Sequence, residues 1–211
     1  MISKRVPEAV IRRLPKYYAK LCELDSQGVI RISSMQLSQK MGLNASQIRQ
    51  DLSYFGGFGQ QGYGYMVENL KDNLAKILGL FADCTMIIVG CGHIGSALAN
   101  YNAFADTGFK IVGMFDSDKN RIGTEINGIP VMDVVTVDDF LKNTKVDIGV
   151  ISVPAETAQN IADVFVRNGI KGIWNFAPID IQAYNVAIED VRLNDSLYAL
   201  SYKMINEIYD F

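Results

Sequence analysis

The chain has 211 residues, of which 49% are hydrophobic, and a formal net charge of −3 at pH 7. This length allows one large domain or two small ones. No apolar run is long enough to span a bilayer, and residues 1–7 lack the apolar core of a signal peptide, so we expect a cytoplasmic protein without membrane contact.

The residues that form disulfides and metal sites are few. Cys22, Cys84 and Cys91 make an odd count without metal-ligand spacing, and there is one histidine. This pattern argues against a disulfide framework and against a metal centre.

The charge is divided unevenly along the chain. Residues 1–83 hold 11 Lys and Arg against 7 Asp and Glu, which leaves 9 basic and 16 acidic residues for 84–211. A basic first third on an acidic remainder suggests a polyanionic partner for the first third only.

The first 81 residues are predicted to be mainly helical, with Pro15 kinking the first helix or ending its first part. Ser34 and Asn44 are the expected caps of two short helices, and Gly42 closes the first of them in the left-handed conformation. The predicted elements are helices over residues 7–24, 35–41, 45–55 and 67–81, and a strand over 29–32.

Two short helices joined by a tight turn indicate a helix-turn-helix, whose second helix enters the major groove of DNA. Arg49 on that helix is the candidate for a bidentate contact with guanine, whereas Gln47 or Gln50 suits adenine. Residues 56–65 alternate glycines with aromatic residues, which suits a tight hairpin serving as the wing of a winged helix.

Residues 86–98 carry the motif that organises the rest of the chain. An apolar run ends in Gly90-x-Gly92-x-x-Gly95 and passes into a helical pattern, which is the context that dinucleotide binding requires. Asp116 ends the next apolar run, 21 residues after Gly95, where an acid would accept hydrogen bonds from the adenosine ribose. The carboxylate favours NAD over NADP, and Lys119 and Arg121 soften that preference.

The pattern that begins with this motif stays α/β to the end of the chain. The predicted strands span residues 86–89, 111–116, 129–131, 146–153 and 172–178, and the predicted helices span 137–141, 156–168 and 197–209. Such alternation predicts a doubly wound parallel sheet of Rossmann type, with ligands bound beyond the carboxyl ends of the strands.

We therefore predict an α/β protein of three parts. Residues 1–80 form a winged helix-turn-helix DNA-binding domain, 81–194 a Rossmann NAD(H)-binding domain, and 195–211 a dimerisation helix that has no place in the sheet.

These motifs together resemble the Rex family of redox-sensing transcriptional repressors. The matching stretches are 5–9 (RVPEA), 47–56 (QIRQDLSYFG), 62–65 (GYGY), 90–98 (GCGHIGSAL) and 175–178 (NFAP). The resemblance implies a homodimer with an exchanged C-terminal helix that binds a palindromic double-stranded operator. It also implies that NADH releases the DNA, whereas NAD⁺ competes for the cofactor site without doing so.

The motifs and the resemblance give two sets of candidate residues. The cofactor set is Gly90, Cys91, Gly92, His93, Ile94, Gly95, Tyr101, Asp116, Lys119, Arg121, Ser152, Val153, Pro154, Phe176 and Ala177. The DNA-binding set is Ser46, Gln47, Arg49, Gln50, Ser53, Tyr54, Gln60, Gln61 and Tyr63.

Several positions depart from the family pattern. Gln50 and Gln61 stand where cations are usual, so fewer counterions would be released on DNA binding. Tyr101 matches the tyrosine near the nicotinamide, but Ala19 and Arg192 replace an arginine and an aspartate of the switch. A divergent member with an altered NADH response is therefore a second hypothesis.

Two further functions compete. An NAD-dependent oxidoreductase would need a substrate domain and a proton-transfer group, yet the histidine lies in the glycine-rich loop, so we expect no enzyme activity. A nucleotide- or CoA-binding regulatory module is also open, because a fold does not decide its ligand.

Overall fold

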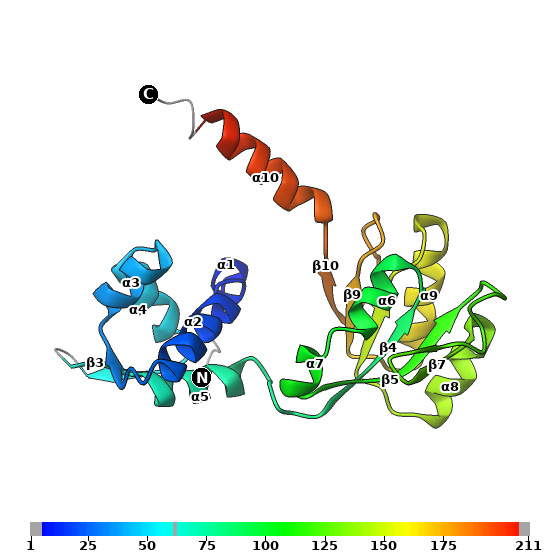
Figure 1. Ribbon diagram of the computed structural model, residues 1–211, viewed down its shortest axis with the longest axis horizontal. Coiled ribbons are helices and arrows are strands. Elements are labelled where there is room, and N and C mark those ends of the chain that lie inside the picture. The colour runs from blue at the N-terminus through cyan, green and yellow to red at the C-terminus, as the bar shows by residue number, and fades with distance from the viewer. Residues whose placement is uncertain (1–5, 61–62, 207–211) are drawn as a thin grey trace. The chain divides into compact units, whose positions relative to one another are not determined.

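The computed structural model describes residues 6–60 and 63–206, and the chain divides into two compact units between Phe81 and Ala82 (Figure 1). In the first unit, strands in the order β1-β3-β2 form an antiparallel sheet beside the helices. Its elements are α1 (Glu8–Ile11), α2 (Leu14–Ser26), β1 (Arg31–Ile32), α3 (Ser34–Met41), α4 (Ala45–Ser53), β2 (Gly59–Gln60), β3 (Gly64–Met66) and α5 (Val67–Ile77).

The predicted helix over 7–24 is two helices, separated at Arg12 and Arg13. Pro15 is the second residue of α2, where the missing N–H would have no helical partner in any case. The prediction that Pro15 would kink the helix or end its first part is confirmed.

The start of α3 corrects the predicted cap by one residue. Ser33, not Ser34, is the N-cap: its hydroxyl accepts from the N–H of Gln36, whose side chain accepts from the N–H of Ser33. This reciprocal capping box outweighs the single bond that a cap at Ser34 would make. Gly42 ends α3 with φ +64°, and Asn44 caps α4, as predicted.

The wing depends on Gly64, which adopts φ +73° at the start of β3. A Cβ at this position would lie 2.6 Å from the carbonyl oxygen of Ile32. Because only glycine tolerates both constraints, β3 can approach β1 closely enough for the antiparallel pairing of Ile32 with Tyr65.

A buried carboxylate joins α4 to α2. Asp51 is 2% exposed, and it accepts two bonds from Arg13, at 2.6 and 2.9 Å, and one from the Tyr17 hydroxyl at 2.6 Å. Burial opposes the charge of Asp51, but the hydrogen bonds from Arg13 and Tyr17 outweigh it and lower its pKa. Burial and the bond to Asp51 raise the pKa of Tyr17.

The second unit is the predicted doubly wound sheet, in the order β10-β9-β8-β4-β5-β7-β6. The strands are β4 (Cys84–Val89), β5 (Phe109–Asp116), β6 (Glu125–Ile126), β7 (Ile129–Asp133), β8 (Ile148–Ile151), β9 (Gly172–Asn175) and β10 (Ala187–Asp190). The helices are α6 (His93–Ala99), α7 (Ala103–Asp106), α8 (Val137–Asn143), α9 (Ala155–Arg167) and α10 (Leu193–Asn206), with a 3₁₀ turn, η1, at Val134–Thr136.

Helices cover both faces of this sheet. Ile87 and Val89 belong to one apolar core with residues of α8 and α9, whereas Ile88 belongs to another with Ala99 of α6. This alternation along β4 follows from the two-residue period of a strand. It leaves the carboxyl ends of the parallel strands free for a ligand.

Several elements differ from the prediction. α5 ends at Ile77 instead of residue 81, and β9 ends at Asn175 instead of residue 178. The short helix α7 was not predicted. β6 pairs antiparallel with β7 at one edge, and β10 was not predicted at the other. β8 is shorter than the predicted strand over 146–153, and α10 begins at Leu193 instead of Leu197. The last three residues of the predicted helix over 197–209 lie outside the described residues. Within the described ranges, no helix is long and apolar enough to cross a membrane.

Replacing Asp51 by Ala should destabilise the first unit by about 3 kcal/mol, because Arg13 and Tyr17 lose their shared acceptor. The check is hydrogen exchange of the α2 and α4 amides in increasing urea. Because the folded-state pKa of Asp51 is lowered, this stabilisation is present at neutral pH and lost as the pH falls through that pKa. The matched control is Glu8→Ala, which removes an exposed partner of Arg12 and should cost under about 0.5 kcal/mol. Equal effects of the two changes would contradict the role of Asp51.

Candidate functional site

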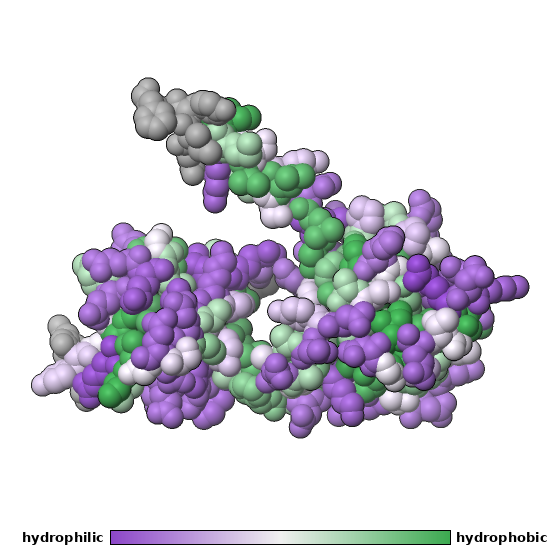
Figure 2. All heavy atoms as spheres, viewed as in Figure 1, coloured by the Kyte–Doolittle hydropathy of each residue, from purple (hydrophilic) through white to green (hydrophobic). Residues whose placement is uncertain are grey.

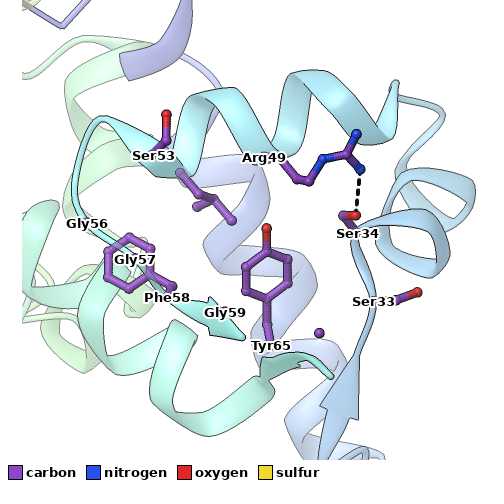
Figure 3. A pocket seen from close by; sticks show the side chains of 11 residues that line it. Ser33, Ser34, Arg49, Ser53, Gly56, Gly57, Phe58, Gly59 and Tyr65 are labelled. Carbon is purple, nitrogen blue, oxygen red and sulfur yellow. Dashed lines mark hydrogen bonds between the residues drawn. The ribbon is translucent and has the colours of Figure 1, made fainter. Parts of the chain in front are cut away.

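A groove of about 640 Å³ lies between α4 and the wing (Figure 3). Backbone from the glycine-rich segment 56–59 forms one wall, and side chains of α4 form another. The lining residues are Ser33, Ser34, Arg49, Leu52, Ser53, Gly56, Gly57, Phe58, Gly59, Gly64 and Tyr65.

Arg49 extends from α4 toward the start of α3, where its Nη1 donates a 3.0 Å hydrogen bond to Oγ of Ser34 (Figure 3). The hydroxyl of Tyr65 points toward α4 from the wing. Burial raises the pKa of Tyr65, and the charge of Arg49 opposes that shift. The groove therefore contains the guanidinium group of Arg49 together with the aromatic rings of Phe58 and Tyr65.

The predicted DNA-binding residues are only partly gathered in this groove. Of the DNA-binding set, Arg49 and Ser53 line it. Elsewhere, Ser46 and Gln50 are exposed on α4, Gln47 and Tyr54 are half-buried, and Tyr63 is exposed in the wing. The Gln60 side chain and the whole of Gln61 lie outside the described residues.

The sequence analysis did not place Ser33, Ser34 or Arg31 among the DNA-binding residues. Arg31 on β1 lies over the Tyr63 ring, 6.0 Å from its centroid. The antiparallel pairing of β1 with β3 brings these residues together, and a strand of two residues gives too little pattern to predict that register.

In the second unit, the three glycines of the loop after β4 have separate roles. A Cβ on Gly90 would lie 2.4 Å from the carbonyl oxygen of Ser152, and one on Gly95 would lie 1.9 Å from that of Gly90. At Gly92, nothing lies within 4 Å of the Cβ position. Gly90 and Gly95 therefore allow close backbone packing, whereas Gly92 leaves space at the N-terminus of α6.

This loop borders a cleft of about 560 Å³ at the carboxyl ends of the strands. Of the cofactor set, seven residues line it: Gly90, Gly92, Asp116, Arg121, Ser152, Val153 and Pro154. Six other lining residues were not in that set, namely Val89, Ser117, Val134, Thr157, Asn160 and Ile161. Val89 ends β4, and Ser117 and Val134 directly follow β5 and β7, so the strand-end rule could have found these three. Thr157, Asn160 and Ile161 lie on α9, and only the packing of that helix brings them to the cleft.

The rest of the cofactor set lies apart from the cleft lining. Cys91, Gly95 and Ala177 are buried, and Lys119 is exposed in the turn after β5. His93 and Ile94 form the first turn of α6.

Asp116 and Arg121 hold the peptide groups of Cys91. The N–H of Cys91 donates to Oδ2 of Asp116 at 2.6 Å, and Nη1 of Arg121 donates to the carbonyl oxygen of Cys91 at 2.6 Å. Oδ1 of Asp116 accepts from the N–H of Asp118 at 2.9 Å. Each carboxylate oxygen keeps acceptor capacity, so Asp116 can both brace the loop and bind ligand hydroxyls.

The thiol of Cys91 is unsuited to redox chemistry. The residue is fully buried, and its Sγ lies 3.4 Å from the carbonyl oxygen of Phe115. Burial, together with the negative charge of Asp116, raises the thiol pKa to about 11. A protonated, buried thiol is a poor nucleophile.

Tyr101 and Phe176 belong to a series of aromatic contacts, and its members Trp174 and Phe176 pack against the core that contains Ile88. Tyr101, 58% exposed, meets Phe104 edge-on at 4.8 Å between ring centroids. Phe104 meets Trp174 at 5.7 Å, and Trp174 meets Phe176 at 4.8 Å. The series connects an exposed tyrosine to the loop that follows β9.

Side-chain hydrogen bonds connect this part of the chain to the end of β10. Nδ2 of Asn175, which is fully buried, donates to Asp190 at 2.6 Å, and its Oδ1 accepts from the N–H of Ala177. Arg192 donates to Oδ1 of Asp180 at 2.6 Å and to the carbonyl oxygen of Ala177 at 3.3 Å. Arg192 is therefore bonded to the loop immediately before α10 begins.

Comparisons with known proteins cover both units. A family model described as a putative DNA-binding protein N-terminus matches residues 5–53, and a CoA binding domain model matches 81–179. A redox-sensing transcriptional repressor Rex from Thermoanaerobacter pseudethanolicus is 52% identical over 96% of this chain and 91% of its own. The Rex repressor of Caldicellulosiruptor bescii is 49% identical over 99% and 96%, respectively.

The chain belongs to the Rex family. The solved structures agree: RSP with β-NAD⁺ and operator DNA has a TM-score of 0.90 at 52% identity, covering 97% of this chain and 94% of that one. RSP with β-NADH has a TM-score of 0.88 at 50% identity, covering 96% and 95%. The resemblance found in the sequence motifs is thus confirmed, and Rex-family relatives are named as transcriptional repressors.

In this Rex-family chain, Cys91 should react with iodoacetamide at pH 8 far more slowly than the half-buried Cys22 and Cys84. Peptide mass spectrometry after timed labelling measures the three rates. The raised pKa of Cys91 also affects the stability of the fold. Between about pH 9 and 11 the thiol keeps its proton in the folded state but loses it in the unfolded state. The free energy of unfolding should therefore fall as the pH rises through that window. Labelling of Cys91 as fast as Cys84 would contradict its burial.

Proposed function

We propose that this chain is a transcriptional repressor whose winged unit binds operator DNA and whose Rossmann unit binds NADH and NAD⁺. The observation that carries the proposal is the presence, in one chain, of the Arg49 groove and of a glycine-loop cleft that ends in Asp116. The RSP structures with β-NAD⁺, β-NADH and operator DNA support it. A regulator of this kind acts beside the chromosome, in the cytoplasm.

The cleft fits a dinucleotide. The open space at Gly92 and the N-terminus of α6 would receive the pyrophosphate, and Asp116 would accept from the ribose hydroxyls. The nicotinamide, which carries the redox state, would lie toward Tyr101 and Phe176. The residues of this chain would bind and orient the cofactor and transmit its redox state to the rest of the protein. We assign none of them a catalytic role.

CoA is the second candidate ligand, because a CoA binding domain model matches residues 81–179. Asp116 argues against it. CoA carries a phosphate on the adenosine ribose, as NADP does, and a carboxylate at this position would repel that charge. Free ribose hydroxyls suit the two oxygens of Asp116, so NAD(H) is favoured.

A dehydrogenase is a weaker alternative. Histidine is the side chain that most often transfers protons in enzymes. The chain has a single histidine, His93, and it is exposed in the first turn of α6. The second unit is occupied by one nucleotide-binding sheet, which leaves little chain for a substrate domain. Regulation of DNA binding accounts for both units, whereas catalysis leaves the winged unit unexplained.

The helix α10 supports a homodimer. It carries seven large apolar or aromatic side chains that are 51–66% exposed and gather along it (Figure 2). They are Leu193, Leu197, Tyr198, Leu200, Tyr202, Met204 and Ile205. An exposed apolar surface of this kind marks an association site, and we propose that a second copy of the chain covers it.

The response to NADH can differ from that of other family members. Arg192 is engaged with Asp180, and Ala19 is an exposed small residue on α2, so neither matches the charged pair implied for the switch. The direct experiment is fluorescence anisotropy of a palindromic duplex, selected from a random library, with added NADH or NAD⁺. We expect NADH to release the duplex and NAD⁺ to leave it bound.

The outcomes separate the hypotheses. Failure to select any duplex at low salt would contradict the repressor function. Selection of a duplex that NADH does not release would favour the divergent member.

In the same protein, Asp116→Ala should weaken NADH binding and narrow the discrimination against NADPH, as measured by calorimetry. Unchanged affinity and preference would contradict the ribose role of Asp116.

Replacing Leu197 and Leu200 together by Asp should prevent dimer formation, because two carboxylates would have to be buried. Analytical ultracentrifugation should give a dimer for the unaltered chain and a monomer for this variant. Ala199→Lys is the matched control, since Ala199 is not in the apolar set and lies about 160° from Leu197 and about 100° from Leu200 around α10, so the change should leave the dimer intact. A monomeric unaltered chain would contradict the proposed dimer.

A further inference from the structure

A serine of one helix holds the arginine of the next. Nη1 of Arg49 on α4 donates to Oγ of Ser34 on α3 at 3.0 Å, across 15 residues of sequence (Figure 3). Both residues line the groove, and no other hydrogen bond or ion pair engages Arg49 among residues 6–60 and 63–206. The charge of Arg49 therefore remains available to a ligand.

Ser34 is itself held in place. The preceding residue, Ser33, forms the reciprocal capping box with Gln36, so the first turn of α3 is fixed by its own backbone. The hydroxyl of Ser34 takes no part in that box. It is free to act on a neighbour, and its removal leaves the cap of α3 intact.

The bond also selects an edge of the guanidinium. Arginine has five N–H donors in a planar fork, and two of them can pair side by side with an acceptor pair. With one N–H of Nη1 committed to Ser34, the Nε–Nη2 edge keeps both of its donors. That edge matches the two acceptors, O6 and N7, of a guanine in the major groove.

We propose that Ser34 is a positioning residue, which holds Arg49 so that its Nε–Nη2 edge reads one guanine in each operator half-site. The proposal rests on the repressor function proposed above. Ordering a long side chain costs free energy, so an arginine that is already oriented loses less entropy when it meets the base. Ser34 thereby determines specificity without itself touching a base.

The test compares the selected operator with duplexes changed one base pair at a time, using Ser34→Ala, Ser34→Thr, Arg49→Ala and the double variant Ser34→Ala/Arg49→Ala. Ser34→Ala should reduce discrimination about 2- to 12-fold, the range for loss of one hydrogen bond, and only at the base pair that Arg49→Ala also relaxes. The slope of log affinity against log salt should not change, because no charge is removed. Ser34→Thr, which keeps the hydroxyl, should restore discrimination.

The double variant should be no worse than Arg49→Ala alone, because Ser34 acts through Arg49. Ser26→Ala is the matched control: its hydroxyl donates within α2, to the carbonyl oxygen of Glu23, and its loss should leave discrimination unchanged. A uniform loss of affinity in Ser34→Ala on all duplexes, additive with Arg49→Ala, would mean that Ser34 contacts phosphate, and would overturn the proposal. So would unchanged discrimination.

A second measurement needs no DNA. In the free protein, the NMR order parameter of Arg49 Nε should fall in Ser34→Ala and recover in Ser34→Thr. If the unaltered chain binds no duplex, the repressor function fails, and an unchanged order parameter at Arg49 then overturns the positioning role separately.

Discussion

The cleft beside the glycine-rich loop after β4 exists because three backbone segments come together at one point. The turn at Gly90 packs against the end of β8 at Ser152, and Gly95 of α6 packs against the carbonyl group of Gly90. Ser152 adds a side-chain bond to that same carbonyl oxygen, at 2.7 Å. Protein interiors do not yield easily, so any added methyl group at either glycine would separate β4, β8 and α6. The position of the open loop at Gly92, and the reach of Asp116 to the Cys91 peptide, follow from this packing.

The winged unit depends on a polar contact instead. Asp51 is on the inner side of α4, and its buried charge is tolerated only while Arg13 and Tyr17 donate to it. Apolar packing of Ile48 and Leu52 would hold α4 against the core, but it would allow small rotations about the helix axis. The bidentate bond from Arg13 sets that rotation. Arg49 lies two residues before Asp51 on the same helix, so the rotation of α4 sets where its side chain begins, and the bond to Ser34 holds its far end.

Much of this could be read from the sequence, because local rules determine it. The caps at Gly42 and Asn44, the break near Pro15 and the glycine spacing at 90–95 depend on residues close together in the chain. The cap at Ser33 was missed by one position because two serines compete there, and only the bond with Gln36 decides between them. β6 and β10 were missed because their pairing partners, not their own short patterns, make them strands. Likewise, the bonds of Arg49 to Ser34 and of Arg192 to Asp180 depend on how separate elements are placed.

The aromatic series from Tyr101 to Phe176 also has an optical consequence. Trp174 is the single tryptophan of the chain, and its ring meets those of Phe104 and Phe176 edge-on. Indole emission depends on the surroundings of the ring, and reduced nicotinamide, unlike the oxidised form, absorbs in the region where indole emits. The fold therefore places an intrinsic fluorophore in this aromatic series, where a change in ring packing would alter its emission without any attached label. In the proposed complex with NADH, the reduced nicotinamide would also absorb part of that emission.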